Sequence, residues 1–507
     1  MIQPSRAANW PTWVIGAFFA SCAVLLAWSL ISPKLAETGS LPSPLPVGTA
    51  RSDDPAGITH IVIFLIDTLR ADRLGTYGYD KLTSPNIDEL ARESVVFDNA
   101  YTPAPWTLPS VASLMTSTFP CEHGVLVDGQ RIAGSLDPLA ARLQRIGYTA
   151  ASFHANPYAG PMSGLDRGFG KCELVSHVDG QLVRDWLDTA QKGPHFLYLH
   201  SIEPHDPYLA SEDSTQIFGT IDSAVRQTIA ERCEHYRKST RVDLDAGLPI
   251  GTTNNTDVQR SALRALDEVR ESYNVLYDAA VRDADARVGE VIEELKRRDF
   301  WNDTLFILMS DHGEELSDHG GWQHDQSVYE ELVRIPLIIK FPRGEVPHRR
   351  VQKVVSLVDV MPTVLEFIGH SKGATSCRGE SLMSLVKAVE GLPADDPTVP
   401  AMRHNIKKFF RPYKEQRGDL NVVVRLGDWK AIWNVEPDTM ELYDLSIDRA
   451  ERENFATERA EFTTALKEFA KDWLSRCREQ GAGQEPAAEP MLDEAQRARL
   501  RSLGYVE

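Results

Sequence analysis

Four short apolar runs, each followed at once by polar side chains, constrain the fold of this 507-residue chain most strongly. The first, His60 to Ile66 (HIVIFLI), is continuous and rich in β-branched residues, which is typical of a parallel strand covered on both faces. Similar runs occupy residues 148–153, 196–199 and 305–309. Helical patterns separate them, at residues 87–95, 136–146, 181–191 and 269–298. This alternation predicts one doubly wound α/β domain whose mostly parallel sheet is sandwiched by helices.

Ionisable side chains follow three of these runs, at the point where each predicted strand ends. Asp67 comes after the first run, and His205 lies just beyond the third. Asp311 and His312 follow the fourth run. Because the carboxyl ends of parallel strands share one edge of a sheet, we expect these side chains to meet at a common rim.

The residues at this rim offer both oxygen and nitrogen ligands for a metal. Asp67 and Asp311 supply carboxylate oxygens, and His312 supplies an imidazole nitrogen. This mixed set suits a borderline divalent ion such as Zn²⁺ or Mn²⁺ better than Ca²⁺, which prefers oxygen ligands only. We therefore predict a divalent metal site, with zinc or manganese favoured over calcium.

The stretch from Pro103 to Ser117 (PAPWTLPSVASLMTS) places a hydroxyl at the start of a predicted helix. Pro109 suits the first helical position, which puts Thr107 near the N-cap. A side chain there faces unpaired backbone N–H groups and the positive end of the helix dipole, so an anion beside it is stabilised. One interpretation of Thr107 is a simple helix cap. The other is a nucleophile, because a divalent cation beside the hydroxyl would lower its pKa.

An uncharged run of 19 residues from Trp13 to Ile31 predicts a single membrane anchor, since that length roughly spans a bilayer core. Residues 1–12 are then a short cytoplasmic N-terminus, and residues 32–57, rich in Pro, Ser and Gly, are a linker. The folded part is accordingly expected outside the cytoplasm, in the periplasm or the extracellular space. Cleavage of the run as a signal peptide is the alternative, and it would release a secreted protein.

Charge and cysteine usage exclude two other classes of protein. The formal net charge is −19 and no long basic run appears, which argues against a nucleic-acid partner held through its phosphates. The six cysteines show no paired spacing and no CxxC motif. We therefore expect neither a disulfide framework nor a zinc knuckle.

A series of motifs in order resembles the sulfatase family of the alkaline phosphatase superfamily, from about Thr59 to Asn454. The motifs include TLRAD, SPNIDELARESVVFDNAY, TLPSVASLMTS, FLYLHSIEPHDPY, YDAAVRDAD, SDHGEELSDHGGWQHD and ELYDLSIDRAERENFA. The resemblance implies a catalytic domain over residues 58–372 and a small C-terminal α+β subdomain over residues 373–478. Residues 479–507 are expected to form a tail.

Several positions depart from the pattern of the sulfatases that this chain resembles. Thr107 stands where they carry the Cys or Ser that is oxidised to formylglycine, and a threonine cannot become that aldehyde. Val111 replaces the Arg of the same motif, Thr68 replaces an Asp, and His312 replaces an Asn. These changes imply a site without formylglycine. They resemble superfamily members that use a metal-bound threonine, such as nucleotide pyrophosphatase-like phosphodiesterases and phosphoglycerol or phosphoethanolamine transferases.

The resemblance also implies a role for each matching residue. The ligands that it implies for one metal are Asp67, Asp311, His312 and Thr107. His205 matches a position that contacts the leaving group or the transferred oxyanion. The resemblance places His324 where relatives carry either a substrate-binding Lys or a histidine that ligates a second metal. In the second case, Glu203 and His205 would complete that second metal site.

The combined reading predicts a membrane-anchored, metal-dependent hydrolase of sulfate or phosphate (di)esters that forms a covalent intermediate on Thr107. Its substrate would be an ester of a small molecule, a glycan or a lipid headgroup. A phosphoethanolamine- or phosphoglycerol-type transferase to a lipid or glycan is the alternative enzyme. A catalytically silent, membrane-tethered binding protein is the alternative of another class.

Overall fold

The computed structural model of the chain describes residues 59–233, 264–387, 406–411 and 420–481, with the isolated positions 261, 494 and 498. The predicted N-terminus, anchor and linker, residues 1–57, lie outside the described residues, as does nearly all of the predicted tail. None of the helices within the described ranges combines the length and the hydropathy needed to cross a membrane.

A nine-stranded sheet lies at the centre of the described fold, in the order β11-β2-β10-β6-β1-β5-β3-β4, with β9 paired to β2. Its strands are β1 (His60–Ile66), β2 (Val95–Tyr101), β3 (Thr149–His154), β4 (Lys171–Leu174), β5 (His195–Ser201), β6 (Thr304–Ser310), β9 (Arg334–Ile335), β10 (Leu337–Lys340) and β11 (Arg349–Ser356). β1 runs parallel to its neighbours β5 and β6, whereas β10 runs antiparallel to β2 and β6. The prediction of a mostly parallel α/β sheet is confirmed.

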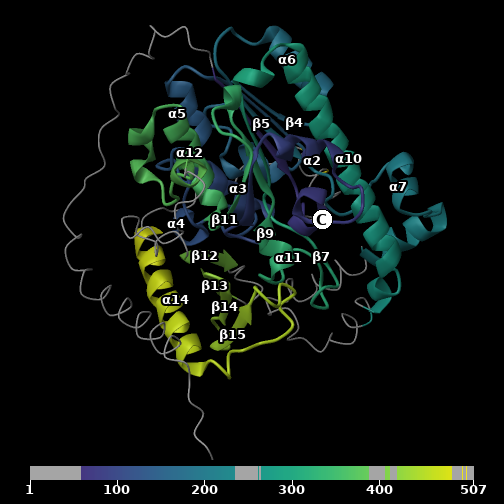
Figure 1. Cartoon of the computed structure of the whole chain (residues 1–507), viewed down its shortest axis with the longest axis vertical. Helices are drawn as coiled ribbons and strands as arrows, with labels where there is room; N and C mark the ends of the chain where they lie inside the picture. The colour runs from purple at the N-terminus through teal and green to yellow at the C-terminus, as the bar shows by residue number, and fades with distance from the viewer. Residues whose placement is uncertain are drawn as a thin grey trace, which may run out of the picture. The chain divides into compact units, whose positions relative to one another are not determined.

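Helices cover both faces of this sheet, as Figure 1 shows. Along β1 the side chains alternate between two apolar cores, with Ile61 and Ile63 in one and Val62 and Phe64 in the other. The helices of the first core are α3 (Thr107–Thr116), α5 (Leu139–Arg145) and α12 (Val360–Phe367). Those of the second are α2 (Pro85–Arg92), α6 (Gly180–Thr189) and α10 (Arg270–Arg297). The central strand is apolar throughout because both of its faces are buried.

The four helices expected from the sequence correspond to α2, α5, α6 and α10, each with bounds within three residues of the predicted ones. The shorter described helices are α4 (Pro120–His123), α7 (Glu212–Phe218), α11 (Glu330–Val333) and α13 (Met383–Lys387). β7 (Glu315–Leu316) and β8 (Trp322–Gln323) pair as a small antiparallel ribbon. This ribbon follows β6 and lies in the segment that carries the predicted site residues Asp311, His312 and His324.

A four-stranded antiparallel sheet and one long helix form the C-terminal part of the described chain. The elements are β12 (Ile406–Arg411), β13 (Asn421–Leu426), β14 (Trp429–Asn434), β15 (Thr439–Asp444) and α14 (Ala460–Gly481). Val422 of β13 and Trp473 of α14 belong to their shared apolar core. Lys430 of β14 is fully buried, and its Nζ ion-pairs with Glu330 of α11 at 3.1 Å and with Glu451 at 2.9 Å. The predicted C-terminal α+β subdomain is confirmed.

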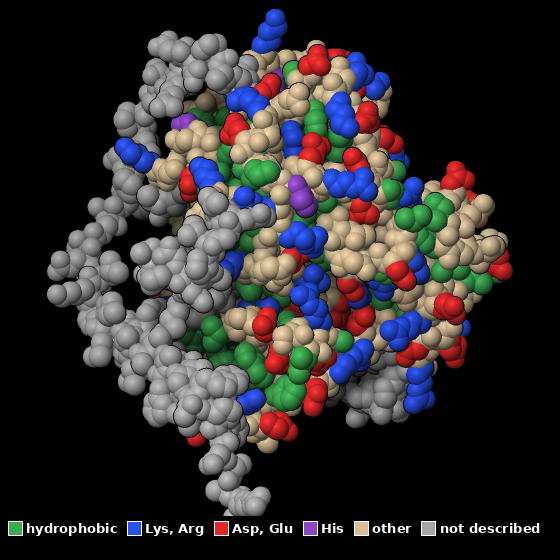
Figure 2. All heavy atoms as spheres, in the orientation of Figure 1, with side chains coloured by type: hydrophobic (Ala, Val, Ile, Leu, Met, Phe, Trp, Pro, Cys, Tyr) green, Lys and Arg blue, Asp and Glu red, His purple; other side chains and the backbone are tan. Residues whose placement is uncertain are grey.

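The face of the molecule seen in Figure 2 carries Lys and Arg side chains interspersed with Asp and Glu side chains. Among the described residues the exposed large apolar side chains are Leu82, Leu209, Ile217 and Ile447. Neither sign of charge dominates in that view. This face therefore presents no broad field of one sign.

A disulfide joins Cys121 of α4 to Cys477 of α14, with their Cα atoms 5.8 Å apart. The expectation that the chain has no disulfide is therefore wrong. The two cysteines are 356 positions apart in the chain, and only the docking of α14 beside α4 brings them together. A search for paired cysteine spacing cannot detect a bond of this kind.

Replacing Cys121 and Cys477 together with serine is expected to lower the free energy of unfolding by about 2–5 kcal/mol, because the cross-link restricts the unfolded chain. Denaturation in guanidinium chloride measures the change. Cys377→Ser, at a half-buried cysteine outside the disulfide, is the matched control and should leave the midpoint nearly unchanged. An equal midpoint for the double variant and the parent chain would contradict the bond.

Candidate active site

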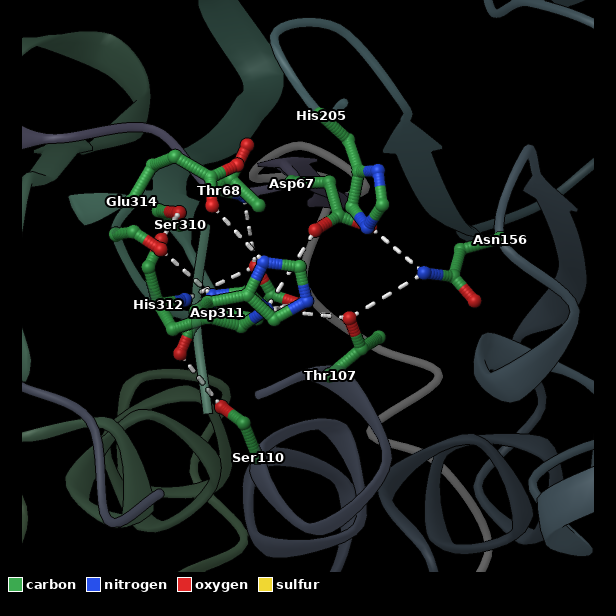
Figure 3. A network of polar contacts seen from close by, with 12 residues as sticks. Asp67, Thr68, Thr107, Ser110, Asn156, His205, Ser310, Asp311, His312 and Glu314 are labelled. Carbon is green, nitrogen blue, oxygen red and sulfur yellow. Dashed lines mark hydrogen bonds and ion pairs between the residues drawn. The ribbon is translucent and has the colours of Figure 1, made fainter. Parts of the chain in front are cut away.

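The polar rim predicted from the sequence lies at the carboxyl ends of β1 and β6, and Figure 3 shows it from close by. Ile66, the last residue of β1, is opposite Ser310, the last residue of β6, so Asp67 and Asp311 follow their strands side by side. Asp67, Asp311 and His312 are fully buried, and each offers one ligand atom within 4.8 Å of the others. The structure thus brings these three predicted residues together.

Asp67 has one engaged carboxylate oxygen and one that is unpaired. Its Oδ2 accepts hydrogen bonds from Asn156 Nδ2 at 2.8 Å and from His200 Nε2 at 3.1 Å. Behind this pair, the Tyr198 hydroxyl contacts His200 Nδ1 at 3.0 Å. Asp67 Oδ1 is buried and has no hydrogen-bond partner in the structure. The supporting groups therefore fix the carboxylate and leave Oδ1 to a ligand.

Asp311 repeats this arrangement, and His312 completes it. Asp311 Oδ1 accepts the backbone N–H of His312 at 3.0 Å, whereas Oδ2 is buried without a partner. His312 Nδ1 donates to the Gly313 carbonyl at 2.8 Å, so in the neutral ring the lone pair lies on Nε2. That atom is 3.6 Å from Asp67 Oδ1 and 3.6 Å from Asp311 Oδ2.

The electrostatics of this group are those of a cation site. Burial and the neighbouring charge of Asp67 raise the pKa of Asp311. Burial also opposes ionisation of Asp67, but the hydrogen bond from His200 and the neighbouring histidines outweigh it and hold the Asp67 pKa below its usual range. Burial lowers the pKa of His312 and keeps the ring neutral. Two unpaired carboxylate oxygens and one imidazole lone pair that converge in this way fit a bound divalent cation.

Thr107 lies at the same place, as the first residue of α3. Its hydroxyl is 3.2 Å from His312 Nε2, to which it can donate, and its Oγ1 accepts from Asn156 Nδ2 at 3.3 Å. The helix begins two residues earlier than predicted: Trp106 is the N-cap, and Pro109 is the third helical residue instead of the first. Thr107 is therefore not the cap, and its side chain is fully buried beside Asp311 and His312.

The structure places His205 and His324 beside this group. The rings of His324 and His312 have centroids 4.6 Å apart, and those of His324 and His205 are 5.0 Å apart. His205 Nδ1 donates to the Asp206 carbonyl, and burial lowers the pKa of His205 to about 3. Within the described ranges Glu203, His205 and His324 do not form a second metal-ligating group.

Sequence reasoning did not select three residues that the structure places in or beside the site. Asn156 bridges Asp67 and Thr107. His200 bonds Asp67, and Glu314 bonds His324. Asn156 and Glu314 lie just beyond the ends of β3 and β6, where the strand-end rule that selected Asp67 also applies. The rule finds the edge of the sheet but does not distinguish residues that support a site from residues that turn the chain.

Removing the hydrogen bond that His200 donates to Asp67 is expected to weaken metal binding. We expect His200→Leu to raise the dissociation constant for Mn²⁺ about 10–100-fold, because the Asp67 carboxylate loses a group that orients it. Competition against a fluorescent chelator measures the constant. His154 is opposite His200 in the register of β3 and β5, so His154→Leu is the matched control. Equal affinities in the two variants would exclude the supporting role.

Comparison with known proteins identifies the family of the chain. The sulfatase family matches residues 59–370, and the family described as N-sulphoglucosamine sulphohydrolase, C-terminal, matches residues 318–480. A choline-sulfatase from Rhizobium meliloti is 25% identical over 452 residues, which cover 79% of this chain and 83% of the relative. A multifunctional alkaline phosphatase superfamily protein from Trinickia caryophylli is 24% identical over 415 residues, covering 66% of this chain and 78% of the relative.

Solved structures show the same fold. One, of a protein bound to its substrate D-glucosamine-2-N,6-O-disulfate, has a TM-score of 0.64 at 21% identity and covers 85% of this chain and 99% of that chain. A phosphonate monoester hydrolase of Agrobacterium radiobacter has a TM-score of 0.62 at 19% identity and covers 85% of this chain and 100% of that chain. Because the sulfatase family match spans more than half of the sequence, the chain belongs to the sulfatase family of hydrolases.

Proposed function

We propose that the chain is a membrane-anchored, metal-dependent hydrolase of sulfate or phosphate esters in which Thr107 is the nucleophile. One observation carries the proposal: the Thr107 hydroxyl lies 3.2 Å from His312 Nε2, beside the unpaired oxygens of Asp67 and Asp311. A threonine cannot supply the aldehyde of formylglycine. Its hydroxyl occupies the position from which an attacking oxygen reaches a group held at this rim.

Asp67, Asp311, His312 and Thr107 Oγ1 would hold the metal ion. We propose zinc or manganese rather than calcium, because one of the ligands is an imidazole nitrogen. When bound, the ion supplies Lewis acidity that polarises the ester oxygens and makes the threonine hydroxyl more acidic. It also neutralises the two buried carboxylates.

The residues of the chain then act in two displacements. In the first, a bond forms between Thr107 Oγ1 and the sulfur or phosphorus, the hydroxyl proton is released to solvent, and the bond to the leaving oxygen breaks. The start of α3 stabilises the oxygens of the transferred group. His205 assists departure of the leaving group by contacting the leaving oxygen, and because burial lowers the pKa of His205 to about 3, the leaving alcohol takes its proton from water. Water then releases the group and restores Thr107.

The substrate that we propose is a sulfate ester of a small molecule or glycan, with phosphate esters as the second candidate. Sulfate esters are supported by relatives described as choline-sulfatase and N-acetylglucosamine-6-O-sulfatase. Phosphate esters are supported by the threonine in place of the formylglycine precursor and by the fold shared with a phosphonate monoester hydrolase. An alcohol in place of water in the second displacement would make the enzyme a transferase.

Export of the catalytic part is a further element of the proposal, with residues 13–31 as the membrane anchor. The Cys121–Cys477 disulfide supports it, because disulfides persist in oxidising compartments outside the cytoplasm.

The test is a set of rates on the purified full-length chain in detergent, stripped of metal and reloaded with Mn²⁺ or Zn²⁺. The substrates are an aryl sulfate, an aryl phosphate monoester and a bis-aryl phosphodiester. We expect metal-dependent turnover of at least one of them, and the preferred ester identifies the substrate class. A burst of one equivalent of phenol that continues only with an added alcohol would instead indicate a transferase. Metal binding without any release of phenol would indicate the binding protein.

A further inference from the structure

Glu314 is a fully buried carboxylate in the loop after β6 that the mechanism above does not use. Its backbone is held firmly: Arg70 Nη1 donates to the Glu314 carbonyl at 3.0 Å. The preceding Gly313 packs so closely that a Cβ there would lie 1.8 Å from the carbonyl oxygen of Glu331. This close approach requires glycine and determines where the next side chain begins. The Glu314 backbone is therefore fixed, and this limits where its buried carboxylate can lie.

At that place Glu314 meets His324. Its Oε1 is 3.1 Å from His324 Nδ1, so the two atoms share one hydrogen bond, and burial raises the pKa of the Glu314 carboxyl. The His324 side chain is 10% exposed, and its ring lies against those of His312 and His205. The contact determines which ring nitrogen faces the protein and how the ring is rotated.

The backbone around His324 is also arranged to aim this side chain. Its two neighbours, Gln323 and Asp325, have φ angles of 70° and 85°, a region that side-chain-bearing residues rarely adopt. Residues with such backbone angles cost free energy and cluster at active sites and ligand-binding sites. The residue presented here is the histidine between them.

We propose that Glu314 is a positioning residue: through its hydrogen bond to Nδ1 it holds the His324 ring in the orientation in which His324 acts on the substrate. The inference rests on the proposed function, because it gives that site one more working part. A lysine presents three equivalent protons and needs no such partner, whereas the two nitrogens of a histidine are different, and a second group must select between them.

The test is a double-mutant cycle on the full-length, metal-loaded enzyme, with Glu314→Leu, His324→Ala and the variant that carries both. We expect each single substitution to lower kcat about 10–100-fold with little change in KM. The double variant should be no slower than the slower single variant, because both changes remove one function. Independent effects that multiply would overturn the proposal.

Two further variants separate orientation from structural damage. Glu314→Gln can still form a hydrogen bond with Nδ1, so it should restore kcat to within about fivefold of the parent enzyme. A loss as large as that of Glu314→Leu would contradict positioning by this hydrogen bond. Glu315→Leu is the matched control, since Glu315 is also buried and bonds the loop at His319 and Gly321. Its effect should multiply with that of His324→Ala.

Metal content and Thr107→Ala keep this inference separate from the proposed function. Bound Mn²⁺, measured by mass spectrometry, should be the same in Glu314→Leu and the parent enzyme. Loss of metal would mean that Glu314 supports the metal site and not His324, which overturns the proposal. If Thr107→Ala stays active, the proposed nucleophile is wrong whatever the cycle shows. If Thr107→Ala is inactive and the cycle is additive, only the role of Glu314 is wrong.

Discussion

Replacing Thr107 with alanine is expected to lower kcat by at least about 10³-fold, because the other hydroxyl in the first turn of α3, that of Ser110, is engaged with the Asp311 carbonyl and Thr102. Binding should survive, since the variant keeps Asp67, Asp311 and His312. We therefore expect the dissociation constant for Mn²⁺ to change much less than kcat. Initial rates on the preferred aryl ester, with a metal titration on the same preparation, measure both quantities.

Two variants control this experiment. Thr107→Ser retains the hydroxyl and should keep most of the activity, whereas Thr116→Ala makes the same deletion at the other end of α3. The Thr116 hydroxyl bonds the Ala112 carbonyl and Thr118, away from the rim, so its loss should leave kcat nearly unchanged. Turnover by Thr107→Ala at the rate of Thr116→Ala would remove Thr107 from the mechanism.

Asp311→Asn is expected to lower kcat by a similar factor, at least about 10³-fold. In the metal-free protein the same substitution is expected to increase stability. Burial and the charge of Asp67 raise the pKa of Asp311 to about 7. A carboxyl whose pKa is raised on folding destabilises the fold as the pH rises from about 4 to 7, since the unfolded chain ionises first. Above that range the metal-free variant should therefore melt at a higher temperature than the parent chain.

The same variant should lose the rise in melting temperature that Mn²⁺ gives the parent protein, because the cation then lacks a ligand. Melting curves at pH 5 and pH 8, with and without metal, test both signs at once. Asp285→Asn is the matched control: Asp285 is a buried carboxyl on α10 whose pKa burial raises to about 6, and it accepts from Asn86 and Ile87. Metal stabilisation in Asp311→Asn equal to that in Asp285→Asn would exclude Asp311 as a ligand.

The rim could be predicted from the sequence because parallel pairing converts position along the chain into position in space. The apolar runs of β1 and β6 end in register, so residues 67 and 311 are neighbours although hundreds of positions separate them. The same rule located His205 near the end of β5. Prediction of the α3 start was less accurate, since proline is accepted throughout the first turn and its place within that turn cannot be read from the sequence alone.

The positions of Asn156 and Glu314 depend on how secondary-structure elements pack together, which local sequence patterns do not predict. Asn156 reaches Asp67 and Thr107 because η4 (Pro157–Ala159) turns the chain after β3. Glu314 reaches His324 because the ribbon of β7 and β8 folds the loop back on itself. Supporting residues such as Asn156 and Glu314 can be recognised only when the structure shows the residue that each one contacts.

The covalent link between α4 and α14 also determines the order of events when this protein is made. Cys121 lies a few positions after the helix that carries Thr107, and its partner follows 356 positions later. A ribosome must therefore synthesise α14 before the bond can close, and a chain that stops before α14 keeps an unpaired thiol at Cys121. The bond thus closes late, after the strands of the central sheet have been made.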